Sequence, residues 1–141
     1  MKLGELTTPV GSGVPQVAKE RVRVLWASGY WDGALDGLAE FDGSQAWYCL
    51  AEEAEDETAA GWFRRFWLVR LTGEQLDDEI RRHDDFRRYV GTHFDYDEQA
   101  GDRADRMRPQ TEWPKFYEKY PEDRRGPGDL SQNEVLGWFE W

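Results

Sequence analysis

The chain has 141 residues, enough for one domain with a substantial core, and its 29 acidic and 18 basic residues give a formal net charge of −11. This charge repels phosphates at long range, so we expect no direct nucleic-acid binding. The single cysteine excludes an intramolecular disulfide, and from the residue pattern we expect neither a signal peptide nor a membrane span. We therefore expect a cytoplasmic protein that does not enter a membrane.

The first 20 residues lack a sustained hydrophobic period. They contain two prolines and two glycines within seven residues, from Pro9 to Pro15. This pattern predicts an irregular N-terminal arm over residues 1–20, either loose or covering one edge of the fold. Residues 21–141 are then expected to form a single α+β domain.

Two Asp-Gly dipeptides, Asp32-Gly33 and Asp42-Gly43, stand ten residues apart between apolar runs. Asp-Gly favours the positive φ angles of tight type I′ hairpin turns, so the segment from Arg21 to Leu71 is expected to be an antiparallel meander. The alternating pattern predicts strands over Arg21–Trp26, about Leu35–Phe41, Gln45–Glu53 and Trp62–Leu71. The third of these strands is apolar on both sides, which indicates a sheet covered on both faces. Between the third and fourth strands, Glu52 to Ala60 is expected to be a solvated acidic loop.

A helix is predicted after the meander. Thr72 and Gln75 form a capping box at its start, and Gly91 suits its C-terminal cap. Its apolar stripe is expected to contain Leu76, Ile80, His83, Phe86 and Val90. The charged residues are expected on the remaining surface of the helix, and these include Glu79 and Arg82.

The pattern weakens after this helix. A short helix is predicted from Pro114 to Tyr120, and the alternation from Asn133 to Trp141 predicts a strand that returns to the sheet. The predicted fold is therefore α+β, a mainly antiparallel sheet of about five strands with one principal helix packed on a face. A long irregular segment precedes the C-terminal strand.

No catalytic motif is present. The serines form no Gly-x-Ser-x-Gly elbow, and no phosphate-binding loop precedes a helix. Cys49 falls within a predicted strand, where a small buried side chain is expected, and His83 lies on the apolar stripe of the helix. We expect no catalytic residue and no cofactor, although an enzymatic role stays open as an alternative.

One cluster suggests a metal site. His93, Asp95 and Asp97 alternate, so an extended segment would point one nitrogen and two carboxylates in the same direction. The spacing departs from a calcium-binding loop, because Ala100 replaces the glycine of the sharp turn and Arg106 replaces the bidentate glutamate. These three residues remain weak metal candidates, and no metal is predicted.

The strongest binding candidates surround the first predicted turn. Tyr30 and Trp31 lie where burial is difficult, and exposed rings of these types often anchor interfaces. Asp32 and Asp36 add acceptors, and Trp47 adds a further ring. The acidic residues Glu52, Glu53 and Glu55 are expected to form a rim that attracts a basic partner.

These features predict a small acidic binding protein that acts through protein–protein interaction. Its most concrete form is an immunity or inhibitor protein directed against a basic toxin or nuclease, so the expected partner is a basic protein. The alternative is a small-molecule-binding protein or enzyme with a Trp-lined pocket and a His/Asp site. Convex exposed rings would favour the first hypothesis, and a concave pocket the second.

Overall fold

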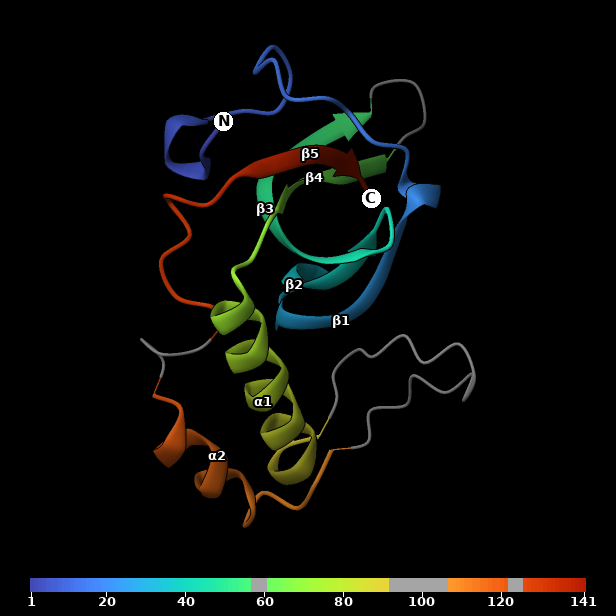
Figure 1. The fold of residues 1–141 in the computed structure, drawn as a ribbon. Helices are drawn as coiled ribbons and strands as arrows, with labels where there is room; N and C mark the ends of the chain where they lie inside the picture. The colour runs from blue at the N-terminus through green and yellow to red at the C-terminus, as the bar shows by residue number, and fades with distance from the viewer. Residues whose placement is uncertain (57–60, 92–106, 122–125) are drawn as a thin grey trace.

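The computed structural model describes residues 1–56, 61–91, 107–121 and 126–141. The fold class is α+β, as predicted, with a five-stranded antiparallel sheet and two helices (Figure 1). In chain order the elements are β1 (Val22–Tyr30), β2 (Ala34–Phe41), β3 (Ser44–Asp56), β4 (Gly61–Val69), α1 (Gly73–Tyr89), α2 (Trp113–Lys119) and β5 (Val135–Glu140). Each strand pairs with its neighbours in the sequence of strands, so the sheet is a simple meander.

The two Asp-Gly turns differ in length. Phe41 pairs directly with Ser44, which leaves a two-residue turn, with φ of 50° at Asp42 and 78° at Gly43. The first hairpin pairs Tyr30 with Ala34 and therefore has a three-residue loop. The prediction of a tight two-residue turn is confirmed at the second position and wrong at the first, where the longer loop projects Trp31.

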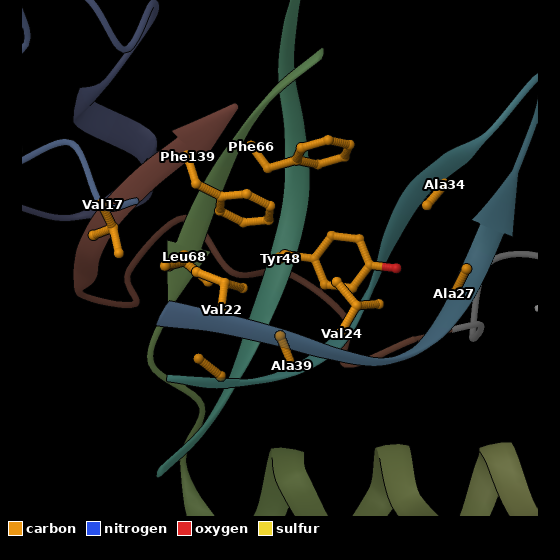
Figure 2. Packing of buried hydrophobic residues seen from close by; sticks show 11 residues of the cluster. Val17, Val22, Val24, Ala27, Ala34, Ala39, Tyr48, Phe66, Leu68 and Phe139 are labelled. Carbon is orange, nitrogen blue, oxygen red and sulfur yellow. The ribbon is translucent and has the colours of Figure 1, made fainter. Parts of the chain in front are cut away.

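The sheet curves strongly, and one face encloses an aromatic core. The stacked rings of Phe66 and Phe139 lie 5.3 Å apart, and Tyr48 meets Phe66 edge to face at 5.5 Å. Figure 2 shows these three rings facing Val22 and Val24 of β1. Because large rings bury more area than small aliphatic groups, a few residues supply most of this core.

A second cluster covers the opposite face and contains the buried indoles of Trp47, Trp67 and Trp138. The N-terminal arm contributes Val14 to it and reaches β5 through a parallel bridge between Gln16 and Trp138. The arm contains two short 3₁₀ turns, Leu3–Glu5 and Lys19–Arg21. Both faces of the sheet are thus covered, as the apolar pattern of β3 predicts.

Helix α1 begins at the predicted capping box. The backbone N–H of Gln75 donates to Thr72 Oγ1 at 3.1 Å, and the backbone N–H of Thr72 donates to Gln75 Oε1 at 3.0 Å. Helix α2 lies beside α1 below the sheet in Figure 1, where Asp85 accepts hydrogen bonds from Lys119 and Tyr120. Among the described residues, no helix combines the length and apolar character needed to cross a membrane.

Two predictions about charged segments are wrong. Glu52 to Asp56 continue β3 and do not belong to a loop, because they pair with β4 as far as Gly61. Glu79 and Arg82 do not lie on the solvent-facing side of α1, since their exposed fractions are 0% and 5%. In both cases residues distant in sequence take part: Arg65 pairs with Glu52 across the strands, and Trp26 and Ser28 of β1 hydrogen-bond the Glu79–Arg82 pair.

Candidate functional site

The residues of the first turn form an exposed aromatic surface. Trp31 is 74% exposed, Tyr30 at the end of β1 is 48% exposed, and Trp62 near the start of β4 is 53% exposed. Tyr30 and Trp62 border a hollow of about 320 Å³ whose lining includes Phe66 and Trp141. We call Tyr30, Trp31 and Trp62 the aromatic surface. Rings on such a surface remain in water unless a partner covers them.

Arg64 holds the turn in place from β4. Arg64 is 5% exposed, and its guanidinium donates to the carbonyl of Trp31 at 2.7 Å and to the carbonyl of Ala34 at 3.0 Å. Its Nε donates to Glu53 at 3.0 Å, and the same group lies 5.0 Å from the centre of the Trp62 ring. One buried cation therefore joins the turn, β3 and Trp62. The turn is positioned before any partner arrives.

The three acidic residues predicted to form a rim, Glu52, Glu53 and Glu55, do not all lie on the same face of β3. Neighbouring residues of a strand point to opposite faces, and accordingly Glu52 bonds to Arg65 at 2.7 Å while Glu53 bonds to Arg64. The pair of Glu52 and Arg65 is a close one, and the hydrogen bond to Glu52 is the largest of the effects that raise the pKa of Arg65. Glu55 is exposed and pairs across the strands with Trp62. Glu53 and Glu55 therefore border the aromatic surface, whereas the charge of Glu52 is used in an ion pair with Arg65.

Asp36 and Trp47 do not join the aromatic surface. They line a different cavity of about 430 Å³ between the sheet, α1 and α2, and Tyr30 lines both hollows. Asp36 accepts a hydrogen bond from the backbone N–H of Gly29 at 2.7 Å. Burial raises the pKa of its carboxyl above the ordinary value, and the Gly29 hydrogen bond opposes this effect. The predicted group of binding residues is thus divided between two places.

Sequence reasoning missed a buried polar network beside this cavity. Glu79 accepts hydrogen bonds from the indole N–H of Trp26 at 3.1 Å and from the hydroxyl of Ser28 at 2.9 Å. Arg82 donates to both carboxylate oxygens of Glu79, at 2.9 and 2.6 Å. The position of Glu79 could have predicted its burial, because this residue lies three positions after Leu76 and four before His83 on the same helical stripe.

The other residues considered for chemistry are His83, Cys49 and the possible metal ligands His93, Asp95 and Asp97. His83 is buried and stacks on Trp26, with 3.9 Å between ring centres and 2° between planes. Burial raises the pKa of the Cys49 thiol to about 12, with a smaller effect from Asp36, so this thiol stays protonated at neutral pH. His93, Asp95 and Asp97 lie outside the described residues. Within the described ranges, no group of three or more His, Cys, Asp or Glu side chains could hold a metal ion.

The chain shows no significant match to a protein-family model, to a curated protein or to a solved structure. Two local arrangements of the described residues are candidates for a functional site. One is an exposed aromatic surface with acidic neighbours, and the other is a cavity lined by a partly buried carboxyl, that of Asp36.

Proposed function

We propose that this chain is a non-catalytic binding protein that recognises a basic protein partner through the aromatic surface. The observation that carries the proposal is the exposure of Trp31, 74%, on a turn whose backbone is held by the buried Arg64. Binding is stronger when the contact residues are already ordered, because less conformational entropy is lost on association. Exposed Trp and Tyr side chains at a rigid position are typical energetic centres of interfaces.

Charge supports a basic partner. The chain has a net charge of −11, which accelerates the approach of a cationic protein and weakens that of an anionic one. The exposed Asp32 and Glu55 lie beside the rings, with the half-exposed Glu53. Lys and Arg side chains of the partner can bond to these carboxylates and lie over the indoles of Trp31 and Trp62.

The most specific form of the proposal is an immunity or inhibitor protein for a cationic toxin or nuclease. An enzyme that acts on nucleic acid needs a basic surface, and a rigid acidic protein that covers this surface blocks substrate access. Such inhibition requires complementarity alone, without bond-making chemistry. It therefore suits a binding surface made of rings and carboxylates.

The test has two stages. Tagged wild-type protein and the Trp31→Ala/Trp62→Ala variant are incubated with lysate of the native host, and each retained protein is then purified. Its affinity for both forms is measured by calorimetry at several salt concentrations. We expect a retained protein of positive net charge and binding that weakens with added salt. The double variant should lose affinity by about thirtyfold or more, since truncating a single central interface aromatic costs about 2 kcal/mol or more.

Tyr117→Ala is the matched control, because Tyr117 is 36% exposed but lies on α2 and does not line the hollow that Tyr30 and Trp62 border. It should retain the partner with wild-type affinity. Asp32→Asn and Glu55→Gln should mainly lower the association rate. Equal binding by wild type and the Trp31→Ala/Trp62→Ala variant, or retention of no basic protein, would contradict the proposal.

A further inference from the structure

The second cavity is built by elements from the whole length of the chain. Strands β1, β2 and β3 supply one wall, α1 and α2 supply another, and the segment from Gly126 to Leu130 closes a side. Its volume of about 430 Å³ lies in the range of small-molecule sites. The cavity has aromatic walls, formed by Tyr30, Trp47, Phe86, Phe116 and Tyr117.

The charges in this cavity are unbalanced. Arg82 lines the cavity, but its guanidinium bonds to Glu79 and to the hydroxyl of Ser28, so that pair is internally compensated. Asp36 also lines the cavity, and it accepts a hydrogen bond from a neutral group, the backbone N–H of Gly29. When Glu79 is counted with Arg82, the described residues around this cavity therefore carry one carboxylate more than they carry cations.

We propose that this cavity binds a small organic cation, an amine or guanidinium attached to an apolar or aromatic body, with Asp36 as its counter-ion. The cationic nitrogen would bond to the carboxylate of Asp36, and the body would lie among the rings of Trp47, Phe86 and Phe116. Aromatic faces attract cations through their quadrupole, and a carboxylate in such a site adds a charge-assisted hydrogen bond.

Alternative ligand classes fit less well. A carboxylate or phosphate ligand would approach Asp36 and Glu79 together, and the guanidinium that could attract it already bonds both oxygens of Glu79. A neutral ligand would leave the ionised Asp36 uncompensated in a desolvated place. Burial is the largest of the effects that raise the pKa of Asp36, and Glu79 adds to it, whereas the Gly29 hydrogen bond and the charge of Arg82 oppose it; a cationic ligand would further favour the ionised carboxylate.

Calorimetry with three probes of similar size tests the ligand class. The probes are 2-phenylethylamine, the neutral 2-phenylethanol and the anionic 3-phenylpropionate, each titrated at neutral pH into the full chain. We expect millimolar or tighter binding of the amine, and weaker binding of the alcohol and acid by about tenfold or more, the difference expected for a charge-assisted bond. Absence of amine binding at millimolar concentration, or equal binding of all three probes, would overturn the proposal.

Variants locate the site. Asp36→Asn keeps an acceptor for Gly29 and removes the charge, so amine affinity should fall about tenfold or more while circular dichroism and the unfolding temperature show a folded protein. Asp32→Asn is the matched control, since Asp32 lies on the turn outside this cavity, and it should bind the amine like wild type. Unchanged affinity in a folded Asp36→Asn variant would overturn the assignment.

The cavity shares Tyr30 with the aromatic surface, but the other two residues of that surface separate the two sites. Trp31 and Trp62 do not line this cavity, and therefore the Trp31→Ala/Trp62→Ala variant should bind the amine normally even where it loses a protein partner. Tyr117→Ala should show the opposite behaviour, with weaker amine binding and normal partner binding. Parallel losses in both variants would contradict a separate small-molecule site.

Discussion

Glu79 and Arg82 form a buried ion pair on α1, with Arg82 Nη2 2.6 Å from Glu79 Oε1. The pair connects the helix to β1, because the same Oε1 accepts hydrogen bonds from Trp26 and Ser28. His83 stacks on the ring of Trp26 in the same interface. The helix thus packs on the sheet through polar groups that satisfy one another, and its attachment depends on this network.

Glu79→Ala should destabilise the fold strongly. The substitution leaves the guanidinium of Arg82 buried without its carboxylate and removes the acceptor for Trp26, so we expect a loss of about 3–5 kcal/mol in the free energy of unfolding. Urea unfolding followed by circular dichroism measures the change. Asp84→Ala, at an exposed position of the same helix, is the control and should change stability by no more than about 0.5 kcal/mol. Similar values for the two variants would contradict the role of the network.

Arg64→Lys should loosen the aromatic turn while keeping the charge. A lysine ammonium cannot match the planar arrangement that reaches the carbonyls of Trp31 and Ala34 and the carboxylate of Glu53. We expect a loss of about 1–3 kcal/mol in stability and faster amide exchange across the turn. Arg70→Lys is the control, because Arg70 is 63% exposed in its pair with Glu134. Equal amide exchange in the two variants would show that Arg64 does not position the turn.

The Cys49 thiol should be unreactive in the folded protein. Burial, assisted by Asp36, raises its pKa to about 12, so the thiolate population at pH 8 is very small. The reaction with Ellman's reagent should be slow in buffer and complete quickly in denaturant, where the thiol titrates normally. Glutathione measured at the same pH supplies the reference rate. A native rate close to that of glutathione would mean that the thiol is accessible and ionised.

Stability near Asp36 should depend on pH. The groups that face its carboxyl are the Gly29 amide, Glu79, Arg82 and the neutral Cys49 thiol. Burial raises the folded-state pKa above 3.8, so the stability contribution of the protonated form is fully present below that value and is lost as pH rises through the folded pKa.

Asp36→Asn removes this titration. Relative to wild type, the variant should therefore gain stability as pH rises from about 4 to neutral, and the gain should level off once Asp36 is ionised. Urea unfolding at a series of pH values measures the difference between the two proteins. A difference that stays constant with pH, or that changes in the opposite direction, would contradict the raised pKa.

Local patterns predicted most of the fold. The positive φ angles at Asp42 and Gly43, the capping box of Thr72 and Gln75, and the strand alternation around Val22 depend on residues close in sequence. Each can be recognised because turn geometry, helix capping and strand alternation act over a few residues. The exposure of Trp31 agrees with its expected position on a turn.

The tertiary structure alone decided which charges are buried and which candidate residues meet. Glu79 is buried because Trp26 and Ser28, more than 50 residues earlier in the chain, satisfy its carboxylate. Asp36 was expected beside Trp31, but it faces a cavity completed by α2 and the segment after Gly126. Residue patterns report local conformation, whereas burial and charge compensation depend on elements that the folded chain brings from far away. The sequence by itself therefore determined the order of the strands along the chain, the tight turn at Asp42-Gly43 and the start of the main helix, whereas tertiary packing decided the two candidate sites.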